Sequence, residues 1–382
     1  MENNEANNKK AKDLDSVFTS SIDFHRNPLF KRLEGKRIPL SFNLELTARC
    51  NNNCPHCYIN LPAGDINAKS AEMSLEFINK IVDEAVSMGA LWCNLTGGEP
   101  LLREDFEDIY LCLRNKGLLI SLLTNGTLIN ERIVKLFARY PPRNIEITVY
   151  GVTQSVYEKV SRKSGSFKAF KKGLGLLLDN GIKVRLKAAA IKSNYLEMPA
   201  IASFCREKTW DYFRFDPFLH LRYDGNPIRN DEIKGERLSA EEIIELERND
   251  SERLKAVKKE CGNIRLKESV SRENALVFRC SAGYNSFTVG FDGVFRICDT
   301  IFHPDCLYDL KAGSLREAWM DFTPKALSIN LEGGKTLHKC WNCKLLDLCD
   351  WCPAKAYLET GSLDREMTLS CEIAHRRAQR FG

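Results

Sequence analysis

The stretch Arg49-Cys50-Asn51-Asn52-Asn53-Cys54-Pro55-His56-Cys57-Tyr58 decides the fold and the chemistry of this chain. Its cysteines follow a C-x3-C-x2-C pattern and offer three thiolates in one loop. A cubane [4Fe-4S] cluster needs four ligands, so three protein thiolates leave one iron open. An open position on a catalytic zinc follows the same logic. The pattern therefore indicates a cluster that can chelate a substrate or cofactor. A zinc knuckle and three unrelated thiols are the alternatives.

The residues around this loop predict where it lies in the fold. Residues 40–46 alternate apolar and polar side chains of β-favouring types and predict a strand. The cysteine loop then follows the C-terminal end of a strand, where α/β barrels keep their active sites. Residues 91–95 predict a second strand, which runs into Thr-Gly-Gly-Glu-Pro at 96–100. The glycines let a backbone approach a ligand closely, and the Glu99 carboxylate can accept from an ammonium group.

The cysteine loop followed by a strand that ends in Gly-Gly-Glu-Pro resembles the radical S-adenosylmethionine (radical SAM) superfamily. The resemblance implies that Cys50, Cys54 and Cys57 hold a [4Fe-4S] cluster whose open iron binds the methionine moiety of SAM. The reduced cluster would cleave SAM to a 5'-deoxyadenosyl radical, which abstracts a hydrogen atom from the substrate. Four residues would contact the methionine end: Gly97, Gly98, Glu99 and Pro100.

Two further positions match the family along the predicted barrel. Residues 146–151 resemble the fourth strand of the family, whose end usually carries a serine that hydrogen-bonds SAM. Thr148 stands there and keeps the hydroxyl. Arg162 matches an arginine that often pairs with the SAM carboxylate. The alternatives are an ordinary strand hydroxyl and a solvated loop arginine.

The order of elements predicts an α/β fold, a partial (βα)6 barrel followed by a small cysteine-rich domain. Alternating strands and helices imply a parallel sheet. The predicted strands are residues 40–46, 92–95, 118–123, 145–149, 183–190 and 212–218. The predicted helices are residues 74–88, 105–116, 131–140, 167–180 and 197–207. The expected segments are a polar, partly disordered N-terminus (1–38), the barrel (39–228), a charged helical linker (229–265) and the C-terminal domain (266–382).

Within the linker, Ser239 followed by Glu241 and Glu242 predicts a helix N-terminus. Most of the linker's charges are interpreted as a solvated face.

A second field of cysteines fills the C-terminal third. Two C-x2-C pairs are the usual zinc signature, so a zinc ribbon is the alternative. The full pattern resembles the SPASM extension of radical SAM enzymes, except that two residues rather than three separate Cys349 from Cys352. The resemblance implies two auxiliary clusters. One would be held by Cys340, Cys343, Cys349 and Cys371. The other would be held by Cys280, Cys298 and Cys352, with Cys306, Cys261 or an open iron in the fourth place.

Three further cysteines and one aspartate have simpler expected roles. Cys93, Cys112 and Cys205 are expected to be buried small apolar residues rather than ligands. Asp299 directly follows Cys298 and matches an aspartate that accepts a proton in family members that oxidise a side chain to an aldehyde. A hydrogen-bonding role beside a cluster is the alternative for Asp299.

Composition excludes several classes of protein. The net charge of +5 is modest for 382 residues and gives no nucleic-acid footprint. No apolar run approaches the roughly 18 residues of a membrane helix. The N-terminus lacks the basic start and apolar stretch of a signal peptide. Fifteen cysteines in such a chain favour metal binding over disulfides and a cytoplasmic location.

The resemblance predicts a maturase that crosslinks, epimerises or oxidises a ribosomally made peptide or protein. Residues 214–226 and 237–239 resemble what many peptide maturases carry there. Since about 38 residues precede the first strand, leader recognition is expected from a separate small protein. A ferredoxin or flavodoxin would supply low-potential electrons. The alternatives are a small-molecule enzyme on this scaffold (tetrapyrrole side-chain removal or alcohol oxidation) and a non-catalytic iron–sulfur electron carrier.

Overall fold

A computed structural model describes residues 36–209, 214–265, 277–278, 280, 282–329, 340 and 343–382. Pro39–Gly382 form one compact unit, and the description below concerns its described residues. The first 35 residues of the predicted N-terminal segment, residues 212–213 of the sixth predicted strand and the predicted domain start at 266–276 lie outside them.

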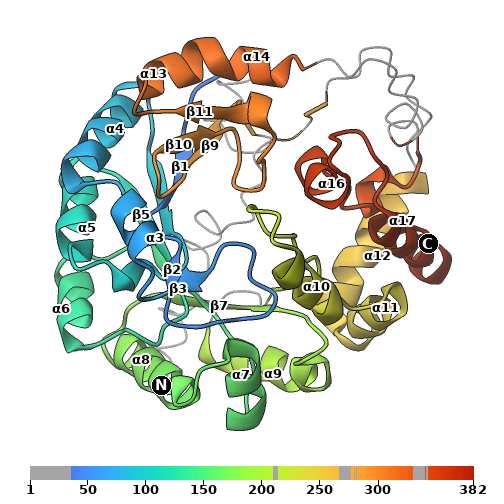
Figure 1. Ribbon diagram of the computed structural model, residues 1–382. Helices are drawn as coiled ribbons and strands as arrows, with labels where there is room; N and C mark the ends of the chain where they lie inside the picture. Colours follow the sequence, from blue (N-terminus) through green and yellow to red (C-terminus); the bar gives the residue numbers. More distant parts are fainter. Residues whose placement is uncertain are drawn as a thin grey trace, which may run out of the picture. The chain divides into compact units, whose positions relative to one another are not determined.

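Six parallel strands form the central part of a nine-stranded sheet (Figure 1). They are β1 (Ser41–Glu45), β4 (Trp92–Thr96), β5 (Leu119–Thr124), β6 (Asn144–Thr148), β7 (Val184–Ala189) and β8 (Arg214–Asp216), adjacent in that order. Within the described residues they coincide with the six predicted strands. The α/β class and the open sheet of a partial barrel are therefore confirmed.

Three short strands from the C-terminal third extend the same sheet beyond β1. β9 (Ser286–Val289) pairs parallel with β1, while β10 (Val294–Arg296) and β11 (Leu307–Asp309) continue it antiparallel. Phe42 of β1 and Phe287 of β9 are in register, and their rings stack with centroids 5.2 Å apart. The region predicted as a separate small domain thus contributes to the barrel's sheet. Strands of three or four residues are too short to show a two-residue period, so the sequence did not predict them.

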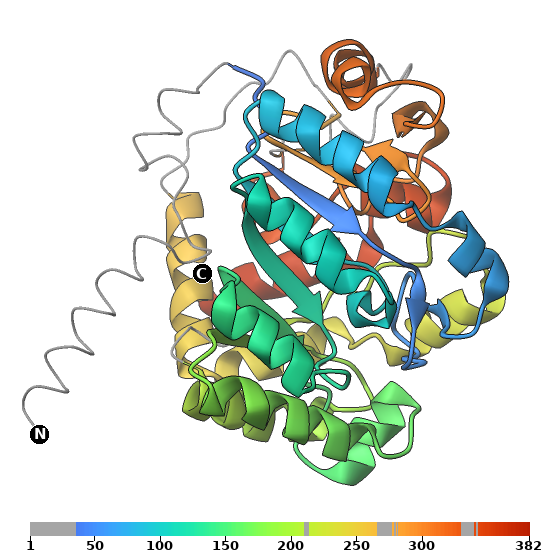
Figure 2. The same cartoon turned by 90° about the vertical axis from the view of Figure 1, so that its left-hand side faces the viewer.

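Helices cover the outer face of the parallel strands (Figure 2). They are α4 (Leu75–Ser87), α5 (Phe106–Asn115), α6 (Glu131–Arg139), α7 (Gln154–Ser161), α8 (Ser166–Asp179) and α9 (Met198–Lys208), of which only α7 was not predicted. In α4 the N-cap Ser74 accepts from the Phe77 N–H, and Ile78, Ile81, Val82 and Ala85 are buried at helical spacing. No helix among the described residues is both long and apolar enough to cross a membrane.

Around the cysteine loop, β2 (Arg49–Cys50) pairs with β3 (Leu61–Pro62), and the short helix α3 (Ile66–Ala71) follows. In the C-terminal third, α13 (Leu315–Glu317) and α14 (Thr323–Leu327) follow β11, and α16 (Pro353–Thr360) and α17 (Thr368–Phe381) end the chain.

The predicted charged linker consists of α10 (Pro227–Glu236), α11 (Ala240–Asn249) and α12 (Ser251–Arg265). The expected start of α11 is confirmed, because Ser239 and Glu242 form a capping box. One charge departs from the expected solvated face. Glu247 is fully buried and pairs with Arg377 of α17 at 2.6 Å and with Arg253 at 3.1 Å. This buried pair joins the linker to the last helix.

Glu247→Gln should lower the stability of the folded protein by about 3 kcal/mol, because it leaves the buried Arg377 guanidinium without its counter-charge. Thermal unfolding followed by circular dichroism measures the effect. Glu245→Gln on the same helix removes an exposed partner of Arg248 and should leave the midpoint unchanged. Equal midpoints for the two variants would contradict the structural role of Glu247.

Candidate active site

The cysteine loop is held by a close contact between two backbone segments. Gly98 N–H donates to Thr47 O at 2.6 Å, and Glu99 N–H donates to Arg49 O at 2.8 Å. A Cβ at Gly98 would lie 2.3 Å from Arg49 O, and one at Gly97 would lie 2.3 Å from Thr47 O. The sequence predicted that these glycines allow approach to a ligand. The structure shows in addition that they allow β4 to dock on the backbone that leads into Cys50.

Glu99 joins the ends of β4 and β5. Its carboxylate is fully buried and accepts from Thr124 Oγ1 and Asn125 N at 2.8 Å, and from Leu101 N at 3.1 Å. Burial raises the pKa of Glu99 to about 7, and these hydrogen bonds act in the opposite direction. Glu99 and the buried Pro100 do not line the central cavity described next.

A cavity of about 460 Å³ lies at the C-terminal ends of the parallel strands. The structure brings seven predicted site residues to its wall: Cys50, Cys54, Cys57, Gly97, Gly98, Thr148 and Asp299. Strand-end loops from both parts of the chain therefore meet in one space.

Burial and mutual proximity set the acidity of the loop thiols. Burial raises the pKa of Cys50 to about 12, and Glu99 and Cys57 add to the effect. Burial also raises the pKa of Cys54, with Cys57 and Cys50 as neighbours. Three thiolates in one buried loop repel one another unless a cationic centre compensates them, as iron does. The donor set and its cavity therefore fit an iron–sulfur cluster. Among the described residues, no group of three His, Cys, Asp or Glu side chains is arranged to hold a single metal ion.

Thr148 and Arg162 have different positions. Thr148 ends β6 and borders the cavity, as does Glu146 two residues earlier. Arg162 follows α7 with φ of 51° and pairs with Glu232 at 2.7 Å, away from the cavity wall. The role of each toward SAM stays a prediction.

Several residues of the cavity wall were not singled out from the sequence: Tyr58, Asn60, Glu146, Tyr150, Lys187, Asp216 and His220. Glu146, Lys187 and Asp216 belong to β6, β7 and β8, and Lys187 Nζ lies 3.0 Å from Glu146 Oε2. Polar residues on the inward face of the last strand positions were the available signal.

Asp299 is exposed and lies on the cavity wall, contributed by the loop that follows β10. It accepts from Thr300 Oγ1 at 3.1 Å. His220 lies on the same wall, with its ring centroid 6.1 Å from that of Tyr58. Burial lowers the pKa of His220, and Lys355 acts in the same direction.

The auxiliary cysteines separate into two neighbourhoods. Burial raises the pKa of Cys298, and Asp299, Cys352 and Cys280 add to it as neighbouring acids. Burial likewise raises the pKa of Cys349 to about 11, with Cys371 and Cys340 as neighbours. Cys343 follows Cys340 in a turn in which its N–H donates to Cys340 O at 3.1 Å. Each neighbourhood contains members of one predicted ligand set, and the two ligand sets stay a prediction.

Cys261 and Cys306, the two candidates for the fourth ligand beside Cys280, Cys298 and Cys352, differ in position. Cys261 packs with Val257, Leu348 and Ala374, in a cluster that Cys349 borders. Cys306 is fully buried in the main core.

Of the cysteines expected to be structural, Cys93 and Cys205 are fully buried, and the half-buried Cys112 donates to Asn79 Oδ1 at 3.1 Å.

A cysteine-lined cavity at the C-terminal edge of six parallel strands is the arrangement expected of a radical SAM site. Residues 44–199 match the sequence profile of the Radical SAM superfamily, so this part of the chain is a radical SAM domain. Members of the superfamily use a [4Fe-4S] cluster and SAM, so the electron-carrier alternative is set aside.

Two curated proteins are similar to this chain in sequence, and a solved structure shares its fold. Fe-coproporphyrin III synthase of Methanosarcina barkeri is 28% identical over 80% of this chain and 80% of its own. The subtilosin biosynthesis protein AlbA of Bacillus subtilis is 27% identical over 68% of this chain, which spans 55% of that relative. Streptococcus suis SuiB bound to precursor peptide SuiA shares the fold, with a TM-score of 0.67 and 16% identity, over 89% of this chain and 78% of that one.

Gly98→Ala should destabilise the protein by about 3 kcal/mol and reduce iron loading, because the new Cβ overlaps the Arg49 carbonyl. Gly175→Ala is the matched control, since nothing lies within 4 Å of a Cβ there and α8 favours alanine. Thermal unfolding and iron content report both effects. Normal iron loading and stability in Gly98→Ala would contradict the backbone contact.

Proposed function

We propose that this radical SAM enzyme is a SPASM-type maturase that abstracts a hydrogen from a ribosomally made peptide or protein, leading to a crosslink, an epimerisation or a side-chain oxidation. The observation that carries the proposal is the shared cavity wall, which is lined by the three loop cysteines and by Asp299 from the C-terminal third. A substrate in this cavity would touch both cysteine-bearing parts of the chain. The similarity to AlbA, a bacteriocin biosynthesis protein, supports a peptide substrate.

The residues of the cavity have separate tasks in this proposal. Cys50, Cys54 and Cys57 would hold the cluster, which supplies the electron for SAM cleavage. The Thr148 hydroxyl would donate to SAM from the end of β6. Asp299 would accept a proton from the substrate, since its exposed carboxylate reaches the same space.

The auxiliary ligands are proposed from the two neighbourhoods of cysteines. One cluster would be held by Cys340, Cys343, Cys349 and Cys371. The other would be held by Cys280, Cys298 and Cys352. The packing of Cys261 beside Cys349 argues against Cys261 as the fourth ligand of the second set.

The proposal also includes an electron donor, a leader-recognition protein and a cellular location. A ferredoxin or flavodoxin would reduce the cluster. A separate protein would recognise a leader sequence of the substrate. The cytoplasm is the proposed location, since thiols that hold clusters persist in a reducing compartment.

A second candidate function is tetrapyrrole side-chain chemistry. It is favoured by the similarity to Fe-coproporphyrin III synthase, which extends over 80% of both chains. The two candidates share the SAM site and differ only in what occupies the rest of the cavity. Fe-coproporphyrin III that is consumed in step with 5'-deoxyadenosine formation would favour this second candidate.

Anaerobic reconstitution should load about twelve irons per chain, the content of three [4Fe-4S] clusters. Iron analysis and 5'-deoxyadenosine formed from SAM and dithionite are the two measurements. Cys54→Ala should abolish 5'-deoxyadenosine formation. Cys343→Ala should retain part of it and lose the modified product.

Two outcomes would contradict these assignments. Normal SAM cleavage by Cys54→Ala would show that the loop cysteines do not hold the active cluster. About four irons together with zinc would leave the radical site intact and refute the auxiliary clusters, which favours a small-molecule substrate.

Thr148→Val should weaken SAM binding about tenfold, since it removes one hydrogen bond without changing the shape of the side chain. Thr148→Ser keeps the hydroxyl and should bind SAM like the native protein. Equilibrium binding of SAM to the reconstituted protein separates the two. Equal affinities would remove Thr148 from the SAM site.

A further inference from the structure

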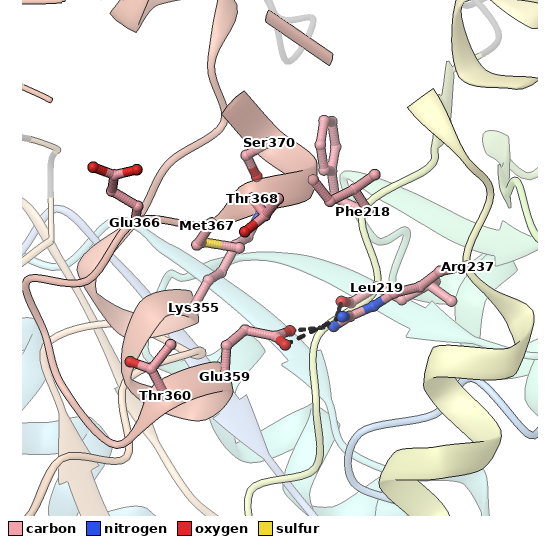
Figure 3. A pocket seen from close by; sticks show the side chains of 11 residues that line it. Phe218, Leu219, Arg237, Lys355, Glu359, Thr360, Glu366, Met367, Thr368 and Ser370 are labelled. Carbon is pink, nitrogen blue, oxygen red and sulfur yellow. Dashed lines mark hydrogen bonds and ion pairs between the residues drawn. The ribbon is translucent and has the colours of Figure 1, made fainter. Parts of the chain in front are cut away.

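The structure has a second cavity of about 300 Å³, whose lining residues are drawn in Figure 3. Phe218 and Leu219, which follow β8, border both cavities. The rest of the second wall comes from Arg237, from α16 (Lys355, Glu359 and Thr360) and from the start of α17 (Glu366, Met367, Thr368, Leu369 and Ser370). Phe218 and Leu219 would therefore stand between a ligand in this cavity and the central cavity.

The start of α17 offers backbone donors to this cavity. The helix has 14 residues, its N-cap Met367 makes no side-chain capping bond, and its first turn has no acidic residue. No described residue accepts from the N–H groups of Thr368, Leu369 or Ser370. Such a helix start carries a partial positive charge and favours an anion.

Ser370 gives an independent indication of a ligand. It borders the cavity and its side chain is only 1% exposed, yet its hydroxyl has no partner among the described residues. A buried hydroxyl is unfavourable unless it is hydrogen-bonded. A group in this cavity with an acceptor oxygen would satisfy it.

Of the two described cations on this wall, Arg237 is paired with a carboxylate and Lys355 is not. Arg237 is neutralised by Glu359 at 3.2 Å and also donates to Leu219 O at 2.9 Å. Lys355 Nζ lies 5.2 Å from the centroid of the Phe218 ring, and no described carboxylate pairs with it. In Figure 3 the Lys355 side chain extends from α16 toward the start of α17, whereas the Glu366 carboxylate points away.

We propose that this second cavity binds a carboxylate of the peptide substrate, from an acidic side chain or from a C-terminus, and so fixes which neighbouring residue enters the central cavity. The Lys355 ammonium, the Ser370 hydroxyl and the N–H groups of α17 would hold the carboxylate oxygens. Phe218 and Leu219 would contact the apolar part of the same residue. This inference rests on the proposed peptide substrate.

The test uses reconstituted protein saturated with SAM, so that the methionine carboxylate site is filled. Ligand-observed saturation-transfer NMR compares three probes: N-acetylglutamate amide, N-acetylglutamine amide and N-acetylglutamine with a free C-terminus. At least one carboxylate probe should bind about tenfold tighter than the neutral amide. The tighter of the two carboxylate probes identifies the source.

The variants locate the binding. Lys355→Gln should weaken the carboxylate probe about tenfold, and Ser370→Ala should weaken it severalfold with unchanged iron content. Lys135→Gln removes an equal charge from an exposed site on α6 and should change nothing. Equal binding of all three probes, or unchanged binding in Lys355→Gln, would overturn the proposal. So would a Ser370→Ala variant that loses iron but binds the probes normally, because Ser370 would then serve the neighbouring Cys371.

This test separates the inference from the proposed function. Probe binding requires neither SAM cleavage nor an identified substrate. If the substrate is a tetrapyrrole, carboxylate probes still bind here while no peptide is modified. If the peptide function holds and only the inference fails, the Lys355→Gln variant modifies its peptide at the native rate.

Discussion

The contact between the Gly97–Gly98 backbone and the Thr47–Arg49 backbone is the constraint on which the site depends. The 2.6 Å hydrogen bond from Gly98 to Thr47 leaves no space for a Cβ, so both positions require glycine. This contact fixes the loop that begins at Cys50 to the end of β4. Glu99, directly after it, fixes β4 to β5 through its buried carboxylate. The Gly-Gly-Glu segment thus has a structural task in this chain in addition to its predicted contact with SAM.

The second constraint is the pairing of β9 with β1. It makes the C-terminal third part of the barrel's own sheet, and Asp299 of this region lies on the wall of the cavity that the first cysteine loop lines. A buried ion pair between Glu45 of β1 and Arg296 of β10, at 2.7 Å, joins the same elements. Removing either partner alone would leave a buried charge, so the pair resists separation of the two regions. The first cysteine loop and Asp299 of the C-terminal third therefore line one cavity.

Part of the site could be predicted because its residues belong to short local motifs at the ends of predicted strands. The loop cysteines, Gly97 and Gly98 follow such strands and Thr148 ends one, and all of them line the cavity. Glu146, Lys187 and Asp216 lie on the same wall but come from three different strands, and no single short motif joins them. Arg162 shows the converse, since a motif match lies in a left-handed turn paired with Glu232 instead of on the wall.

The sequence by itself determined the class of fold and the six parallel strands, because alternation of side chains is a local property. Only the tertiary structure decided that the C-terminal strands join the barrel's sheet and that Glu247 is buried against Arg377. The same holds for the second cavity between Phe218 and the start of α17. The reason is physical: strand pairing, buried ion pairs and cavities join residues far apart in the chain, and no periodicity within a short segment encodes them.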